Sequence, residues 1–155
     1  MSSPRPAPRA DELACVAAGG VIGALARAGI SVWLPHPHPA SWPVATFLTN
    51  VLGCLILGVV LAFVDGRHNR WLATSPRRAR LARPFLATGV LGGFTTFSTF
   101  SVEVVQMIRA GSVGLATAYL GCSVLVGIAA FIAGRALGSQ WFGVSAVDLQ
   151  ADEEL

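Results

Sequence analysis

The chain has 155 residues, of which 54% are hydrophobic and only 12% are charged, and its mean hydropathy is +0.64. This composition excludes an ordinary soluble domain, in which about a quarter of the residues are charged. The net charge of +3 does not indicate a nucleic-acid partner, and the usual nucleotide-binding and catalytic motifs are absent from the sequence. The chain is therefore predicted to be a membrane protein and not an enzyme.

Four apolar stretches are long enough to cross a bilayer, which takes ~20 residues of helix. The predicted fold is all-α, with transmembrane helices at about residues 13–34, 44–64, 84–108 and 113–137. Polar tails at residues 1–12 and 138–155 flank this four-span domain, and neither has the composition of a folded domain. The three cysteines all lie inside spans, so no disulfide or metal site is inferred from them.

The distribution of arginine predicts the orientation of the chain, because all eleven basic residues are Arg. Nine of them lie in the first tail, between the second and third spans, or at the end of the fourth span: Arg5, Arg9, Arg67, Arg70, Arg77, Arg78, Arg80, Arg83 and Arg135. The opposite side holds Arg109 and at most Arg27. By the positive-inside rule, both termini and the Arg-rich connection are expected to be cytoplasmic.

The first span contains GGVIGALARAG, in which Gly19 and Gly23 form a small-xxx-small step. Such a step lets two helices approach closely and is mainly a packing signal. Arg27 follows four residues later, and a charge near a helix centre costs ~2.5–3.5 kcal/mol on insertion scales. Two interpretations remain open: Arg27 snorkels to the outer interface, or it has a role at membrane depth.

The second span contains TFLTNVLGCLILG, with Asn50 about a third of the way along it. The amide of Asn50 carries donors and an acceptor that hydrocarbon cannot satisfy, so it is expected to face protein, water or a ligand. An interhelical hydrogen bond, worth ~0.6 kcal/mol on average in membranes, is the simpler of these alternatives.

The third span contains GVLGGFTTFSTF followed by SVEVV, which adds Glu103. Its glycines are poor helix formers, and its hydroxyl side chains compete for backbone groups, so the helix is predicted to break near its middle. Broken backbone at membrane depth is tolerated where it is buried in protein or lines a watery cavity, and freed carbonyls are natural cation ligands. A continuous helix with polar packing is the alternative.

Three phenylalanines recur at every third position of this segment: Phe94, Phe97 and Phe100. In a continuous helix they form roughly one stripe, while Ser98 and Thr99 point elsewhere. Such a stripe is more often core packing than a site. A phenyl ring nevertheless has a positive edge, and ring edges can replace part of the water around a small anion without trapping it.

The fourth span places Tyr119 and Ser123 four residues apart, and therefore on one face of a helix. The two hydroxyls form a polar track, or each simply bonds to a carbonyl one turn earlier.

Together these features resemble the CrcB/Fluc fluoride ion channels, which are small four-span bacterial membrane proteins. The resemblance covers nearly all of residues 19–134. It rests on four motifs: G-G-x-x-G-A-x-x-R from Gly19, T-x-x-x-N-x-x-G from Thr46, G-G-x-T-T-F-S-T-F-S-x-E from Gly92, and Y-x-x-x-S from Tyr119. The third motif is highly specific and the last is weak.

The resemblance implies an antiparallel dimer with two pores in the bacterial plasma membrane, each lined by both subunits, through which fluoride leaves the cytoplasm passively. It also implies a structural sodium ion (Na+) at the dimer centre, held by main-chain carbonyls that correspond to Gly92 and Thr95. The implied pore residues are Asn50, Phe97, Phe100, Ser98, Thr99, Tyr119 and Ser123. Glu103 matches the family's acidic position, and Arg27 matches its first-span arginine.

The arginine bias departs from what an antiparallel homodimer requires, which is insertion in both orientations. A chain with a single orientation needs an oppositely biased homologue as its partner. Both an antiparallel homodimer and a heterodimer are therefore kept as expectations.

Two other classes of protein fit the sequence less well. A proton-coupled small multidrug transporter needs a carboxylate in the first span, where this chain has Arg27 instead. A purely structural or assembly-factor membrane protein does not need Asn50, the glycine-rich break and the phenylalanine stripe together.

Overall fold

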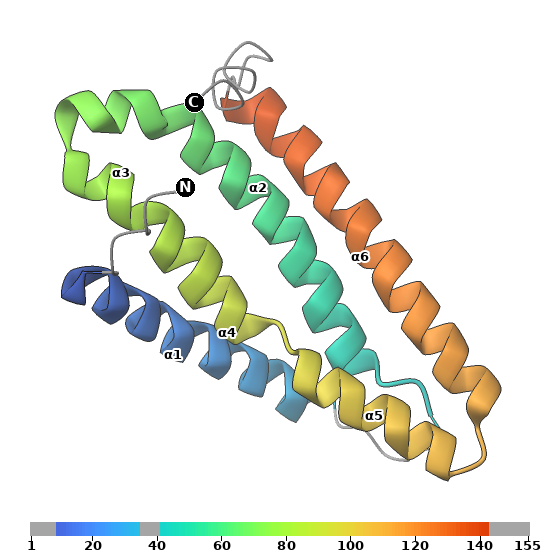
Figure 1. Cartoon of the computed structure of the whole chain (residues 1–155). Helices are drawn as coiled ribbons and strands as arrows, with labels where there is room; N and C mark the ends of the chain where they lie inside the picture. The colour runs from blue at the N-terminus through green and yellow to red at the C-terminus, as the bar shows by residue number, and fades with distance from the viewer. Residues whose placement is uncertain (1–8, 35–40, 143–155) are drawn as a thin grey trace, which may run out of the picture.

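A computed structural model describes residues 9–34 and 41–142, and every regular element in these ranges is a helix (Figure 1). Four helical stretches of 24, 31, 34 and 30 residues are long and apolar enough to cross a membrane, which confirms the predicted all-α, four-span fold. The elements are α1 (Ala10–Trp33), α2 (Val44–Thr74), α3 (Pro76–Arg83), the π-helical segment η1 (Pro84–Leu91), α4 (Gly92–Phe94), α5 (Phe97–Arg109) and α6 (Val113–Phe142).

The third span is broken near its middle, as predicted. The α3–η1–α4 half ends at Phe94, Thr95 and Thr96 are extended with φ/ψ of −77°/159° and −144°/123°, and α5 begins at Phe97. The half before the break is itself widened, since η1 begins at Pro84. Proline lacks the N–H of a regular helical bond and crowds the carbonyl four residues earlier, so a wider turn starts there.

The Arg-rich connection between the second and third spans is helical, where the sequence alone indicates a loop. Helix α2 continues to Thr74, well past residue 64, and α3 begins at Pro76 after a single intervening residue, Ser75. Proline suits the first turn of a helix because no N–H is needed there. At 31 residues and ~1.5 Å per residue, α2 is about 46 Å long and exceeds the ~30 Å of hydrocarbon.

The fourth span also ends later than expected, at Phe142 instead of 137. The later ends of α2 and α6 have the same cause. Hydropathy marks where the apolar residues stop, whereas the helix continues into polar surroundings because its backbone hydrogen bonds do not depend on apolar side chains.

Helices α2 and α6 lie side by side along most of their length (Figure 1). Glycines permit this close approach from both sides. A Cβ atom at Gly134 would meet the backbone of Leu55, and one at Gly58 would meet the backbone of Phe131.

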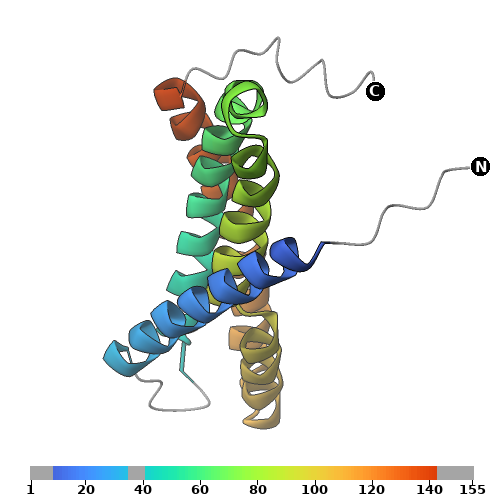
Figure 2. The same ribbon diagram turned by 90° about the vertical axis from the view of Figure 1, so that its left-hand side faces the viewer.

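Helix α1 packs on the half of the third span that precedes the break, and it crosses the other helices at a steep angle (Figure 2). The contact is made by small residues, as the sequence indicates. A Cβ at Gly23 would meet the carbonyl oxygen of Val90, and one at Gly93 would meet the carbonyl oxygen of Gly20. The first span is therefore held directly against the segment that leads into the break.

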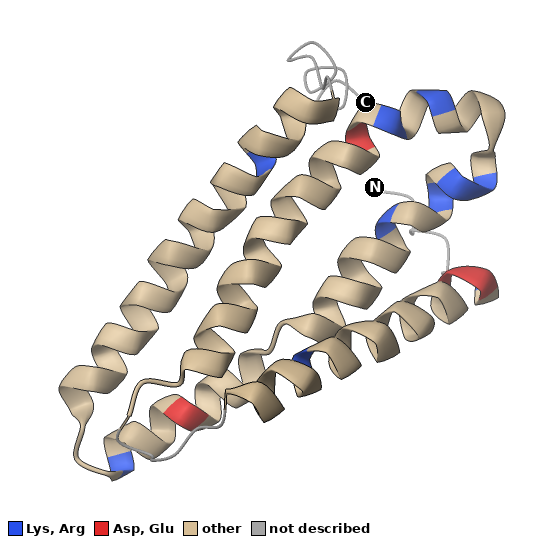
Figure 3. Cartoon of the chain, turned by 180° about the vertical axis from the view of Figure 1, so that it is seen from behind, with Lys and Arg blue, Asp and Glu red and all other residues tan. Residues whose placement is uncertain are grey.

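Most of the described arginines lie at the end of the bundle where α2 passes into α3 and α6 ends (Figure 3). Two ion-pair clusters tie the helices together there. Arg80 of α3 pairs with Asp11 and, at 3.6 Å, with Glu12 of α1, and Arg135 of α6 pairs with Asp65 of α2 at 2.7 Å.

Candidate functional site

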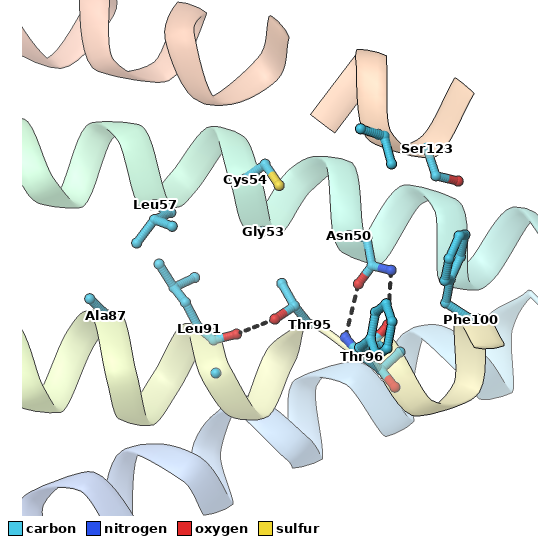
Figure 4. A pocket seen from close by; sticks show the side chains of 13 residues that line it. Asn50, Gly53, Cys54, Leu57, Ala87, Leu91, Thr95, Thr96, Phe100 and Ser123 are labelled. Atoms are coloured by element: carbon cyan, nitrogen blue, oxygen red, sulfur yellow. Dashed lines mark hydrogen bonds between the residues drawn. The ribbon is translucent and has the colours of Figure 1, made fainter. Parts of the chain in front are cut away.

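A pocket of about 450 Å³ lies beside the break, between α2, the third span and α6 (Figure 4). Its walls are mostly apolar, and its polar groups come from a few residues. Of the predicted site residues it brings together Asn50, Gly92, Thr95, Phe97, Phe100 and Ser123.

Asn50 fastens the broken backbone to α2. Its side-chain Nδ2 donates to the carbonyl oxygen of Thr96 at 3.0 Å, and the Thr96 N–H donates to Asn50 Oδ1 at 2.9 Å (Figure 4). One amide side chain thus satisfies both peptide groups of an extended residue at membrane depth, where water cannot do so. The amide nitrogen has a second N–H that this pair does not use.

Thr96 also starts the helix that follows the break. Its Oγ1 accepts from the N–H of Thr99 at 3.1 Å, which makes Thr96 the N-cap of α5. The hydroxyls of Ser98 and Thr99 lie 3.3 and 3.0 Å from the same oxygen. Threonine is a favoured N-cap because its oxygen replaces the carbonyl that the first turn lacks.

These side-chain bonds free two carbonyls of the third span. In a continued helix the Gly92 carbonyl would pair with the Thr96 N–H, which instead donates to Asn50. The Thr95 carbonyl would pair with the Thr99 N–H, which instead donates to the Thr96 hydroxyl. The two residues expected to hold sodium are thus the ones whose regular helical partners are taken by side chains.

Arg27 supplies a partner for the carbonyl between them. Its Nε donates to the Gly93 carbonyl oxygen at 3.2 Å, in a partly buried position. This oxygen belongs to the last turn before the break, where a helix carries partial negative charge and a cation is favoured. Arg27 therefore binds the third span, which favours a role at membrane depth over simple snorkelling.

The phenylalanines do not form the single stripe that a continuous helix would give. Phe94 lies before the break and is buried, whereas Phe97, after the extended residues, is 80% exposed. The Phe97 and Phe100 ring centroids are 6.1 Å apart, and the Phe100 ring lies 5.0 Å from the Tyr119 ring. Phe97 and Phe100 thus stay together at the pocket, and Phe94 joins the core.

The predicted polar track is divided within this chain. Ser123 lines the pocket, and its Oγ is buried with no hydrogen-bond partner among the residues of the two described ranges. Ser98 is exposed, and neither Ser98 nor Thr99 lines the pocket. The Tyr119 hydroxyl donates to Glu103 and Tyr119 does not line the pocket.

Glu103 forms a second, buried polar centre beyond Phe100. Its two carboxylate oxygens accept from the Thr46 hydroxyl at 2.6 Å and from the Tyr119 hydroxyl at 2.8 Å. The carboxylate is 8% exposed, and no salt bridge reaches it from any residue whose position is described. Its stabilisation therefore comes from two neutral donors, which also fix α5 against α2 and α6.

Three residues of this arrangement were given no role at the site from the sequence, although Thr46 and Thr96 both belong to the motifs quoted above. Thr96 was noted only as one of several hydroxyls, although its place three residues before Thr99 is that of an N-cap. Thr46 lies one helical turn before Asn50 and on the same face, so the spacing was a usable signal. The Trp42 ring lies 5.3 Å from the Tyr119 ring, and no motif or spacing in the sequence around Trp42 indicates this contact.

Comparison with known proteins places the chain among named relatives. The family model described as CrcB-like protein, Camphor Resistance (CrcB), matches residues 14–135. The chain is 40% identical over 136 residues to the fluoride-specific ion channel FluC 2 of Nocardia farcinica, covering 86% of this chain and 91% of the relative. It is 44% identical over 120 residues to FluC of Hyphomonas neptunium (77% and 88% covered) and 46% identical over 119 residues to FluC 1 of Mycobacterium bovis (77% and 83% covered).

The Asn50–Thr96 pair leads to a stability prediction. Asn50→Ala removes both hydrogen bonds and leaves two peptide groups unpaired at membrane depth, which costs about 1–3 kcal/mol for each buried group. We expect a lower unfolding temperature in detergent and faster amide hydrogen exchange across residues 92–100. Asn69→Ala, at an exposed position near the end of the same helix, is the control and should change neither. Unaltered exchange in Asn50→Ala would show that the Asn50–Thr96 hydrogen bonds do not hold this segment in place.

Proposed function

Because this chain belongs to the CrcB family, we propose that it is a channel that conducts fluoride passively across the membrane, through the pocket beside the break in the third span. The observation that carries this proposal is the grouping of Asn50, Ser123 and the Phe97 and Phe100 rings around one cavity at membrane depth. Relatives that are 40–46% identical are named fluoride-specific ion channels.

The chemistry of the pocket suits a small, strongly hydrated anion. Ser123 offers a buried hydroxyl, and Asn50 offers the second N–H of its side-chain amide, which does not bond to Thr96. Phenyl edges carry partial positive charge. Each of these groups is a weak partner, so together they replace water around fluoride while still allowing it to leave, whereas a full positive charge would hold it.

The direction of transport follows from the charge of the ion. A membrane potential that is negative inside favours anion exit by ~2.3 kcal/mol per 100 mV. With the termini and the Arg-rich connection in the cytoplasm of a bacterial cell, the channel lowers intracellular fluoride without ATP.

A second chain is needed to complete the pore. Phe97 is 80% exposed, and Ser98 and Gly92 are exposed beside it. The hydroxyl and the backbone face the outside of the single chain at membrane depth, where polar groups require protein or water as a partner. An antiparallel dimer, in which the partner's residues cover this face and extend the polar path past Ser98 and Thr99, supplies that cover for two pores.

A sodium ion at the dimer centre fits the carbonyls at the break. The Gly92 and Thr95 oxygens lose their regular helical partners to side-chain bonds, and no described atom beyond the adjoining residues and backbone of its own helix lies within 4 Å of the position a Gly92 Cβ would take. Main-chain oxygens suit a hard monovalent cation, as at other broken membrane helices. Sodium bound there would hold the two chains together. Arg27 donates to the carbonyl oxygen of Gly93, the residue next to Gly92.

Glu103 and Tyr119 are proposed to form the far end of the ion path. Their hydrogen bond orients the Tyr119 ring, which packs against Phe100. The buried carboxylate thus positions an aromatic wall of the pore and does not itself compete for the anion.

A heterodimer is proposed beside the homodimer because of the arginine bias. Nine arginines lie on one side of the spans and two at most on the other. Names such as FluC 1 and FluC 2 among the relatives are consistent with organisms that hold two such proteins. An oppositely biased homologue would supply the inverted subunit.

Fluoride flux is the direct test. Purified protein in liposomes loaded with potassium fluoride should release fluoride when valinomycin makes the membrane permeable to potassium, and liposomes loaded with potassium chloride should release almost no chloride. The assay is run with the chain alone and with an oppositely biased homologue. No fluoride release in either case would refute the proposed function.

The role of the ring edge is tested by Phe97→Leu, which keeps an apolar side chain but removes the ring. We expect fluoride release to fall by at least about tenfold, equivalent to ~1.4 kcal/mol, with dimer assembly retained on gel filtration. Phe142→Ala, at the end of α6 and outside the pocket, is the control and should conduct normally. If Phe97→Leu also conducts normally, the ring is not part of the path.

The orientation is tested with reporter fusions at the C-terminus. The arginine bias predicts signal from a cytoplasmic reporter only, and the same reporter inserted at Gly111, between α5 and α6, should give the opposite result. Equal cytoplasmic and periplasmic signals at the C-terminus would instead indicate insertion both ways and a homodimer.

A further inference from the structure

A second pocket, a groove of about 510 Å³ at the Arg-rich end of the bundle, shares no lining residue with the pocket beside the break. Leu81, Phe85 and Leu86 of the third span contribute most of its apolar lining, which we call the floor, and Trp71 from the end of α2 also lines it. Arg77 and Arg78, in the first turn of α3, line its polar rim. The groove therefore joins an apolar surface to two guanidinium groups.

Arg77 and Arg78 differ from Arg80 of the same helix in having no charged partner among the described residues. Arg80 pairs with Asp11 and Glu12, and Arg135 pairs with Asp65. Within residues 9–34 and 41–142, no carboxylate forms a salt bridge with Arg77 or Arg78, and both side chains are exposed. Two neighbouring positive charges are thus available to an anion at the rim.

The groove lies where a membrane surface is expected. The last turns of α2 bend away from the axis of its first part and run across the end of the bundle (Figure 1). Trp71, in these turns, is the residue type enriched at the boundary between headgroups and hydrocarbon. The floor continues from this level along η1 toward the hydrocarbon.

We propose that the groove binds one anionic phospholipid, with its phosphate on Arg77 and Arg78 and an acyl chain along Leu81, Phe85 and Leu86. A small soluble anion would not use the apolar floor, and a zwitterionic lipid would leave the two positive charges uncompensated. Basic residues next to a membrane helix attract anionic lipid. Here an adjoining apolar groove can also hold an acyl chain, which makes the surface a defined lipid-binding site. The proposal does not depend on which ion the chain conducts.

The test uses the full chain with Trp71 as its only tryptophan, after Trp33→Phe, Trp42→Phe and Trp141→Phe, in phosphatidylcholine vesicles. Lipids with brominated acyl chains quench tryptophan fluorescence on contact. Brominated phosphatidylglycerol should quench Trp71 at least about twofold more than brominated phosphatidylcholine at the same mole fraction, because the headgroup charge is what the arginines select.

A matched pair of variants separates a site from general surface charge. Arg77→Gln with Arg78→Gln should abolish the difference between the two lipids. Arg70→Gln with Arg83→Gln removes the same charge from the same end, at exposed positions outside the groove, and should preserve it. A loss of the difference in both pairs would overturn the proposal in favour of diffuse attraction.

Two further outcomes of the quenching experiment would also contradict the proposed lipid site. Equal quenching by both lipids would show that the rim does not select charge, and quenching by neither would show that protein covers the groove, either residues 1–8 or a second copy. A second measurement uses the unaltered chain: native mass spectrometry should detect one retained phosphatidylglycerol per chain, and none after the Arg77 and Arg78 changes. Equal retention of phosphatidylcholine would refute the site.

Discussion

The hydrocarbon core contains no water, so every peptide group that leaves a regular helix there needs a partner within the protein. The break in the third span meets this constraint with side chains. Asn50 binds both the N–H and the carbonyl of Thr96, and the Thr96 hydroxyl caps α5. The same bonds that make the break tolerable also decide which carbonyls are left without a regular helical partner, so the groups proposed to bind a cation are set by how the rest of the backbone is hydrogen-bonded.

The first span supports the break from the other side. Small residues let α1 approach the third span until Gly20 and Gly93 are in contact, and Arg27 reaches the Gly93 carbonyl. The cost of a guanidinium at membrane depth, ~2.5–3.5 kcal/mol on insertion scales, is offset here by a helix terminus with partial negative charge. Without the close approach this bond could not form, which connects the glycine pattern of the first span to the site.

The number of spans and the break could be predicted because both depend on local composition: apolar runs of spanning length, and glycines beside competing hydroxyls. The ends of α2 and α6 could not, since hydropathy reports the bilayer boundary and not the end of backbone hydrogen bonding. For the site, Asn50 was identifiable as a polar group that needs a partner, but the partner, Thr96, lies 46 positions away. The stripe of three phenylalanines that a continuous helix would give does not form, because two extended residues separate Phe94 from Phe97.

The single residue between α2 and α3 has a consequence for biosynthesis. With only Ser75 between two helices, the second and third spans form a helical hairpin, and its two arms are expected to enter the membrane as a pair. Six arginines lie in this hairpin's turn region, from Arg67 to Arg83. An inverted subunit, which an antiparallel homodimer requires, would have to carry all six across the membrane, so this short connection is where the arginine bias opposes inversion most strongly.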